Sequence, residues 1–351
     1  MKDYKKKYEP IFNSFIKSDK NKDIDSNPST MRDIGCGENA LVKEVRYKKK
    51  YCAAKLTEKL PGIAYSKNLR GPNLLKTHQI LETKADGNIY NIIIMEKALL
   101  RDLGKLAIYL QENNFLKLIN NPFFEIIGNN LVKYITKEIV KGLETLDRNE
   151  LVHYDLKLEN ILIESGFKIK ISDFSFLINL KEYKKNNEKL KIPKETRGYM
   201  TPEYFRDDER YDAESIKKQD YFALGASLFL LIMGGQMLKY KKSDEQLSED
   251  RIIDLLQRDI AHLESNALLD NDMVDFIKDL IQYIPDERPS FEFIYRNKWL
   301  NKDFNYILPL THTFLKEEED KLIKELVKSD FIMEKQKSIE NELRRNFEFV
   351  E

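Results

Sequence analysis

The chain has 351 residues, of which 42% are hydrophobic, enough for a sizeable core in one large two-lobed domain or two smaller ones. Lys and Arg together number 59, as do Asp and Glu, so no overall charge favours nucleic acid or an anionic membrane as a partner. The two cysteines are too few for a disulfide framework and favour a reducing compartment, which we expect to be the cytoplasm, with the nucleus left open.

Residues 1–24 are expected to form an N-terminal extension of the folded part. They are rich in Lys and Asp and contain only a few aromatic residues, a composition that predicts a loosely attached segment. No apolar run follows the basic residues at the start, so we expect no secretory signal.

Residues 25–98 are predicted to form a small antiparallel sheet. Residues 41–45 and 51–55 alternate in the way typical of strands, and a second pair fits residues 76–82 and 88–95. The second pair is joined by the turn Ala85-Asp86-Gly87.

Residues 99–302 are predicted to form a larger, mainly helical part. Leu131, Ile135, Ile139 and Leu143 recur every four residues and would form one apolar stripe along a helix. The longest apolar stretch, 221–233, is shorter than the roughly 18 residues of a membrane span and predicts a buried core helix. The architecture is therefore expected to be α+β.

Residues 303–351 are expected to form a charged helical C-terminal extension. Their apolar positions alternate with charges, which suits an amphipathic helix or a helical hairpin. The sequence leaves open whether this segment packs on its own domain or binds a regulatory partner.

The most specific chemical pattern lies between residues 153 and 173. Phosphoryl transfer from a nucleotide needs a proton acceptor, oxygen ligands for Mg²⁺ and cations at the phosphates. In His153-x-Asp155 the Asp has the spacing of the proton acceptor, with Asn160 five residues later as a metal ligand. Lys157 would reach the transferred phosphate, and Asp173 supplies a second carboxylate for the metal.

These residues resemble the catalytic loop and the Asp-Phe-Gly element of eukaryotic-type protein kinases. Gly35-x-Gly37-x-x-Ala40-x-Val42 resembles the glycine-rich loop of that family, and Lys55 its phosphate-binding lysine. Met95-Glu96-Lys97-Ala98 resembles the hinge between the lobes. The resemblance implies Asp155 and Lys157 as catalytic residues, Asn160 and Asp173 as metal ligands, and an ATP site of Gly35, Gly37, Val42, Ala53, Lys55, Met95, Glu96 and Ala98.

The resemblance covers about residues 30–300 and implies a bilobal fold that binds ATP and Mg²⁺. The segment from Thr196 to Glu203 is similar to the substrate-docking segment of the family, and together with Lys157 it points to the Ser/Thr branch. Glu203 and Arg288 resemble the buried ion pair of the large lobe, and Asp220 the residue that braces the catalytic loop.

The chain departs from the family in the helix that normally follows the phosphate lysine and supplies its glutamate partner. Between Lys55 and Gly71 the only carboxylate is Glu58, and Pro61 and Gly62 oppose a regular helix. We therefore predict a short or displaced helix. Lys55 would then be held by Glu58, by Glu38 or by the nucleotide alone.

The catalytic loop also has Tyr154 where the family usually has an Arg that meets a phosphorylated residue. Residues 176–195 contain no Ser or Thr, and Tyr183 is their only phosphorylatable residue. Both features predict that Ser/Thr phosphorylation does not switch this segment on. The six lysines of the segment indicate either a solvated surface or an acidic protein substrate.

Two further substitutions, Ser175 for the Gly of Asp-Phe-Gly and Ala40 for the third loop glycine, are small and should tune nucleotide binding. The predicted function is a Ser/Thr protein kinase that transfers the γ-phosphate of ATP to a protein hydroxyl. The alternative is a pseudokinase, a nucleotide-binding scaffold or allosteric partner.

Overall fold

Alternating segments of the N-terminal region form a five-stranded antiparallel sheet in the order β1-β2-β3-β5-β4. Its strands are β1 (Arg32–Cys36), β2 (Ala40–Tyr47), β3 (Lys50–Glu58), β4 (Thr77–Ala85) and β5 (Asn88–Met95). Asp86 and Gly87 join β4 to β5 with φ angles of 50° and 77°, as expected for a tight hairpin turn. The predicted strand pairs and turn are confirmed.

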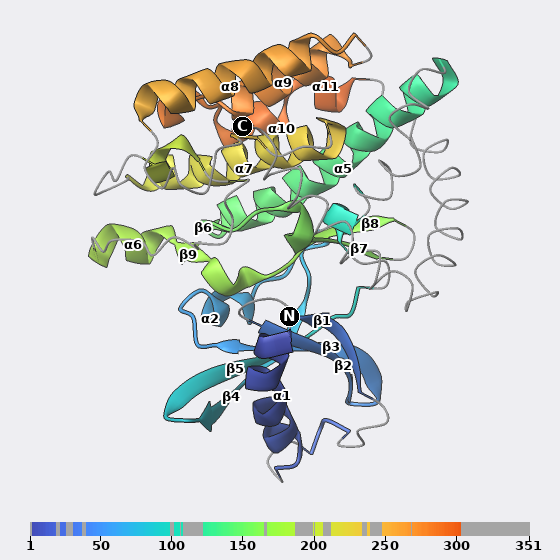
Figure 1. The fold of residues 1–351 in the computed structure, drawn as a ribbon, viewed down its shortest axis with the longest axis vertical. Coiled ribbons are helices and arrows are strands. Elements are labelled where there is room, and N and C mark those ends of the chain that lie inside the picture. The colour runs from blue at the N-terminus through green and yellow to red at the C-terminus, as the bar shows by residue number, and fades with distance from the viewer. Residues whose placement is uncertain are drawn as a thin grey trace.

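The computed structural model describes residues 2–18, 22–25, 31–36, 40–98, 102–105, 107, 122–164, 167–186, 199, 201–205, 212–233, 237–238, 248–267 and 269–302. The sheet forms a small lobe, and most of the helices form a larger lobe beside it (Figure 1). The bilobal α+β arrangement expected from the sequence is confirmed. The prediction for residues 303–351 lies outside the described residues.

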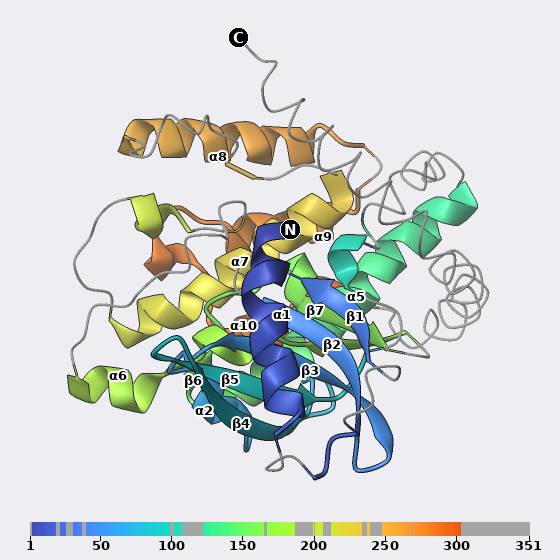
Figure 2. The ribbon, with the colours of Figure 1, turned by 60° about the horizontal axis from the view of Figure 1, so that its bottom comes forward.

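Helix α1 (Lys2–Ile16) packs across one face of the sheet (Figure 2). Tyr8 and Phe12 are fully buried, and Phe15 nearly so. They pack in one cluster with Leu41 and Leu56 of the sheet. The prediction of a loosely attached segment was wrong, because apolar residues spaced three or four apart give α1 a continuous apolar face.

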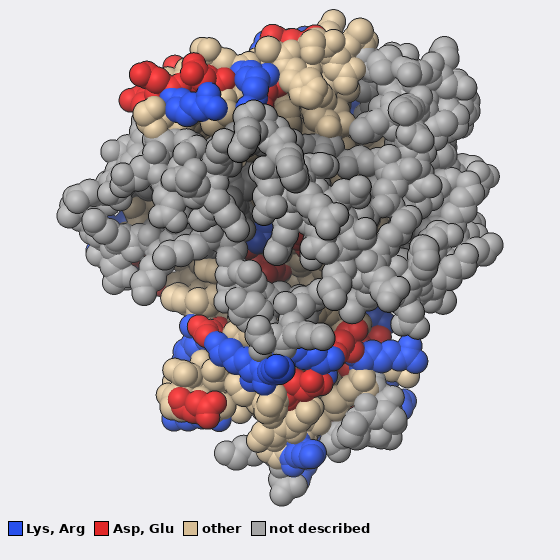
Figure 3. Space-filling model, viewed as in Figure 1, with Lys and Arg blue, Asp and Glu red and all other residues tan. Residues whose placement is uncertain are grey.

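Charged residues of α1 add polar contacts at the edges of this interface. The Lys5 ammonium lies 2.5 Å from the Asp33 carboxylate, and the Lys7 ammonium lies 2.9 Å from that of Glu58. Lys and Arg side chains mix with Asp and Glu side chains over this part of the small lobe (Figure 3). Because exposed ion pairs contribute at most about 1 kcal/mol each, apolar burial dominates the attachment of α1.

The large lobe is built around two long helices. Helix α5 (Pro122–Arg148) buries the predicted stripe of Leu131, Ile135, Ile139 and Leu143, and α7 (Ala213–Met233) is buried along most of its length. Around them lie α8 (Glu249–Glu264), α9 (Asn271–Leu280), α10 (Phe291–Tyr295) and α11 (Lys298–Asn301). Among the described helices, none combines the length and apolar composition that crossing a membrane requires.

A buried ion pair joins two parts of the large lobe. The Arg288 guanidinium donates to both carboxylate oxygens of Glu203, at 2.7 and 2.6 Å. Arg288 is 0% exposed and Glu203 2%. The predicted pair is confirmed, and Arg288 also donates to the backbone carbonyls of Gln282 and Lys218.

Short strands, turns and helices connect the long elements. Strands β7 (Ile161–Glu164) and β8 (Lys168–Ile171) form a hairpin, and β6 (Leu151–Val152) pairs with β9 (Ile178–Asn179). The 3₁₀ turns η2 (Leu158–Asn160), η3 (Phe174–Phe176), η5 (Pro202–Phe205) and η6 (Pro285–Glu287) and helix α6 (Leu180–Asn186) complete the large lobe. In the small lobe, α2 (Ile63–Ser66) spans only four residues, so the predicted short helix is confirmed.

Candidate active site

The backbone of the loop after β6 is fixed by a buried carboxylate. Asp220 on α7 accepts hydrogen bonds from the backbone N–H groups of His153, at 2.7 Å, and Tyr154, at 2.9 Å. Tyr154 has a φ of 65°, an uncommon conformation for a residue other than glycine. Burial raises the pKa of Asp220, against the opposing effect of His153 and the two backbone donors. The predicted bracing role of Asp220 is confirmed.

His153 connects this loop to the segment that precedes Asp173. Its Nε2 lies 2.8 Å from the backbone carbonyl oxygen of Ser172, and its Nδ1 lies 3.3 Å from the backbone N–H of Asp155. Because Nδ1 accepts from that N–H, Nε2 carries the proton and donates it to Ser172. The His153 ring therefore fixes the loop that carries Asp155 relative to the segment that precedes Asp173.

Asp155, Lys157 and Asn160 form one contiguous polar cluster. The Lys157 ammonium lies 3.0 Å from Oδ2 of Asp155, and Nδ2 of Asn160 donates to the same oxygen at 2.9 Å. Burial alone would lower the pKa of Lys157, but the adjacent Asp155 carboxylate outweighs it and raises that pKa. Asp155 is only 3% exposed, and Lys157 and Asn160 together hold its carboxylate in one orientation.

Asp173 follows directly on the segment that Asn160 holds. The Ser172 N–H donates to the carbonyl oxygen of Asn160 at 2.8 Å, which brings the two candidate metal ligands into neighbouring positions. The Asp173 Oδ1 atom lies 2.5 Å from the Lys55 ammonium and accepts from the Ser175 hydroxyl at 2.7 Å. Burial would raise the pKa of Asp173, but Lys55, with help from Ser175 and Lys157, holds it well below its usual range.

The partner of Lys55 differs from the prediction. Glu58 follows Lys55 by three residues on β3, so its side chain points to the opposite face of the sheet. There it pairs with Lys7 of α1 at 2.9 Å. Glu38 lies outside the described residues. The carboxylate that holds Lys55 is Asp173, a contact that sequence reasoning did not find.

Strand register places the predicted nucleotide residues in two adjacent rows. Gly35 pairs with Val42, and Val42 pairs with Lys55. In the next row Ala53 pairs with Met95 at the end of β5. Directly paired residues of antiparallel strands share a face, so all five lie on the face that carries the Lys55 ammonium. Gly37 lies outside the described residues.

The predicted hinge residues follow β5 and are fixed by contacts on both sides. The Glu96 N–H donates to the Lys76 carbonyl oxygen at 2.9 Å, and its carboxylate lies 2.6 Å from the Lys170 ammonium on β8. Burial would raise the pKa of Glu96, but Lys170 lowers it overall. Ala98 lies just beyond, outside any strand. The Glu96–Lys170 pair, which was not predicted, ties the hinge to the strand that leads to Asp173.

A second ion pair at the hinge joins Lys97 to Glu44 on β2. Glu44 pairs across the sheet with Ala53, so this contact lies beside the row that carries Met95. This contact was not predicted either, because it joins side chains 53 positions apart.

The available side chains fit a magnesium ion. In the part of the chain that the structure describes, no three His, Cys, Asp or Glu side chains gather as a metal cluster. Asn160 and Asp173 offer amide and carboxylate oxygens, the hard ligands that Mg²⁺ prefers. Mg²⁺ typically takes one or two protein ligands and completes its shell with phosphates and water. This pair therefore suits a metal delivered with a nucleotide.

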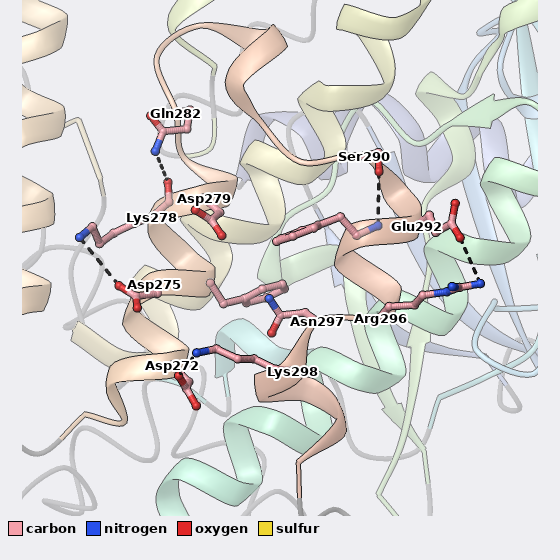
Figure 4. Close-up of a pocket in the computed structure, with 12 residues that line it drawn as sticks. Asp272, Asp275, Lys278, Asp279, Gln282, Ser290, Glu292, Arg296, Asn297 and Lys298 are labelled. Carbon is pink, nitrogen blue, oxygen red and sulfur yellow. Dashed lines mark hydrogen bonds and ion pairs between the residues drawn. The ribbon is translucent and has the colours of Figure 1, made fainter.

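A groove of about 820 Å³ lies far along the chain from these residues, between α9 and the segment that carries α10 and α11 (Figure 4). The Asp272 carboxylate on α9 lies 2.7 Å from the Lys298 ammonium at the start of α11, while Arg296 points away from α9 to Glu292. None of the predicted site residues lines this groove. The candidate site is therefore the cluster around Asp155 and Asp173, where carboxylates, two ammonium groups and an amide lie in contact.

Comparison with known proteins gives consistent matches over most of the chain. A family model described as the protein kinase domain matches residues 29–300. The chain is 25% identical over 283 residues to the probable cell cycle serine/threonine-protein kinase CDC5 homolog of Encephalitozoon cuniculi (strain GB-M1), covering 80% of this chain and 53% of that protein.

Two further relatives match over different lengths. The serine/threonine-protein kinase ATG1c of Arabidopsis thaliana is 24% identical over 292 residues, covering 78% of this chain and 36% of that protein. The rhodopsin kinase GRK1 of Rattus norvegicus is 32% identical over 160 residues, covering 45% of this chain and 26% of that protein. The chain thus spans about half the length of the first relative and less of these two.

Proposed function

This chain belongs to the protein kinase family, and from that premise we propose that it transfers the γ-phosphate of ATP to a Ser or Thr hydroxyl of a protein. One observation carries the proposal. Lys55, Asp155, Lys157, Asn160 and Asp173 are linked to one another by direct contacts or through Ser172. Every residue type that phosphoryl transfer requires is present in this cluster.

The contacts suggest a task for each member. Asp155 would accept the proton of the substrate hydroxyl, with Asn160 and Lys157 holding its carboxylate in place. When substrate is bound, the Lys157 ammonium would also contact the transferred phosphoryl group and stabilise its negative charge. Asn160 and Asp173 would hold Mg²⁺, and Lys55 would bind the remaining phosphates. ATP would supply the phosphoryl group, and Mg²⁺ would neutralise part of the negative charge on the phosphates.

Two observations favour the alternative of a nucleotide-binding pseudokinase. Lys55 has a metal-ligand carboxylate as its partner rather than a glutamate from a small-lobe helix. Ser175 replaces the glycine after Asp173-Phe174 and bonds the same carboxylate. Against this alternative stands the retention of all the groups that act on phosphate or metal, so we favour the active enzyme.

Radiolabelled phosphate transfer to generic protein substrates separates the two functions. We expect the parent protein to label substrate, and the Asp173→Ala variant to be at least about 100-fold slower, because a metal ligand is lost. Transfer by the parent no faster than by this variant would exclude the enzyme. Mg²⁺-dependent nucleotide binding without transfer would instead support the scaffold.

We further propose that the segment after Asp173 needs no Ser/Thr phosphorylation to adopt its position. Tyr154, which stands in place of the usual Arg, packs with Tyr183 against an apolar cluster. The buried members of this cluster are Val152, Ile178, Leu180 and Ile216, drawn from β6, β9, α6 and α7. Apolar packing and the β6–β9 pairing thus attach this segment to the lobe without a phosphate.

Phosphatase treatment of the purified protein tests this proposal. Mass spectrometry first verifies that residues 176–195 of the treated protein carry no phosphate. We expect the treated protein to transfer phosphate to substrate as fast as the untreated protein. The Tyr183→Phe variant removes the last phosphorylatable hydroxyl of that segment but keeps the ring, and it should also remain active. Loss of activity that follows the loss of a phosphate from this segment would refute the proposal.

We propose that the exposed lysines of α6 favour an acidic protein substrate. Lys184 and Lys185 are exposed, and Lys181 is exposed with its ammonium 2.6 Å from the Glu150 carboxylate. An acidic protein substrate would fit this surface, and its turnover would fall as salt rises because exposed charges are screened.

A further inference from the structure

The turn before α2 packs directly on the backbone that follows Asp173. A Cβ atom added to Gly62 would lie 2.4 Å from the Leu177 nitrogen and 2.6 Å from the Ser175 carbonyl oxygen. Gly62 has φ −60° and ψ −28°, which any residue adopts. Glycine is therefore needed here for space rather than for its conformation. Both neighbours are backbone atoms, which cannot turn away as a side chain can.

The residue that Gly62 touches also holds Asp173. Ser175 is buried; its hydroxyl donates to Asp173 at 2.7 Å and lies 3.4 Å from the Lys55 ammonium. Phe174, between them, packs edge-on against the His153 ring with centroids 5.8 Å apart. Ser175 thus lies between the Gly62 turn, which its carbonyl oxygen faces, and the Asp173 carboxylate, which its hydroxyl bonds.

A second contact, three residues after Gly62, holds α2 to the same segment. The Tyr65 hydroxyl donates to the Glu182 carboxylate on α6 at 2.5 Å. Burial and this carboxylate raise the pKa of Tyr65 to about 12, so the hydroxyl keeps its proton at neutral pH. Ile63, between the two contacts, is buried. Helix α2 is thus held against both η3 and α6.

We propose that Gly62 and Tyr65 are positioning residues that hold Asp173 against Lys55, whose partner in related kinases is a helix glutamate instead. The short α2 turn carries no acidic residue and so cannot pair with Lys55 itself. It instead presses on the backbone of Ser175 and Leu177 and keeps the Asp173 carboxylate within reach of the ammonium. The catalytic meaning of this arrangement rests on the proposed kinase function, whereas the contact itself does not.

The Gly62→Ala variant tests this role against a matched Gly71→Ala control. At Gly71 an added Cβ would also be crowded, at 2.9 and 3.0 Å, but by the side chain of Thr145, which can rotate. We expect Gly62→Ala to lower kcat by about 10- to 100-fold, as misplacement near 1 Å can do, and to require more Mg²⁺ for tight ATP binding. The control should match the parent in both measurements.

Hydrogen–deuterium exchange of the nucleotide-free protein gives a readout that needs no activity. Peptides covering residues 174–182 should exchange faster in Gly62→Ala, and peptides of α7 should not change. Tyr65→Phe, which removes one hydroxyl and no packing, should accelerate exchange in the same peptides to a smaller extent. If Gly62→Ala matched Gly71→Ala in exchange and in Mg²⁺ dependence, the proposal would be overturned. A parent without transfer would overturn the kinase function alone, since exchange still tests the contact.

Discussion

The Asp155→Asn variant is expected to transfer phosphate about 100- to 10,000-fold more slowly than the parent at saturating ATP, the range typical for removal of a general base. Asparagine has nearly the same shape as aspartate, so the backbone hydrogen bonds of the loop to Asp220 should persist. What is lost is the carboxylate that would accept the proton and that pairs with Lys157. The expected loss is therefore in kcat.

Initial rates across ATP concentrations, with direct measurement of ATP affinity, separate this loss from weaker binding. ATP affinity should change little, because Lys157 and Asn160 hold the Asp155 carboxylate, whereas Lys55 and Asp173 pair with each other. Asp147→Asn is a matched control: Asp147 pairs with Lys217 at 2.9 Å at the surface of the large lobe. A kcat equal to that of the control would remove Asp155 from the proposed mechanism.

That Asp155, Lys157 and Asn160 form one cluster was predictable because their contacts are local. Asp155, Lys157 and Asn160 lie within six residues, and a short loop before η2 brings their side chains together by its own geometry. Asp173 was also within reach of sequence reasoning, since it follows a strand that pairs with the strand after Asn160. Spacing along the chain thus fixes most of this cluster.

The partner of Lys55 was not predictable in the same way. The contact joins residues 118 positions apart and depends on how the two lobes meet and on the Ser175 hydroxyl. One part of the error was avoidable. Strand alternation already places Glu58, three residues after Lys55, on the opposite face, so a strand prediction for residues 51–58 excludes it as the partner.

Helix α1 shows how an average over composition hides a pattern. Lysines dominate residues 2–7, and the segment as a whole is polar. Yet Tyr8, Phe12 and Ile16 recur at intervals of four, the spacing of one helix face. The sequence alone does not show which surface these residues cover. That surface is the apolar face of the sheet turned away from Lys55, which is recognised only once the strand register is known.

The Phe12→Ala variant is expected to lower the free energy of unfolding by about 3 to 5 kcal/mol, the usual cost of removing a fully buried aromatic ring. Phe12 is 0% exposed and packs among Tyr8, Phe15 and the sheet residues of the same cluster. The loss would be a large share of the roughly 5 to 15 kcal/mol that stabilises a typical domain. Urea denaturation followed by circular dichroism measures it.

Phe293→Ala is the matched control for this measurement, since it makes the same substitution on α10 at a side chain that is 53% exposed. Surface substitutions usually change stability by less than about 0.5 kcal/mol, so the two variants should differ clearly. If Phe12→Ala were as stable as Phe293→Ala, α1 would contribute little and the segment would be dispensable. If the expected loss is found, α1 is an integral layer of the small lobe, and the sheet that carries Lys55 depends on it.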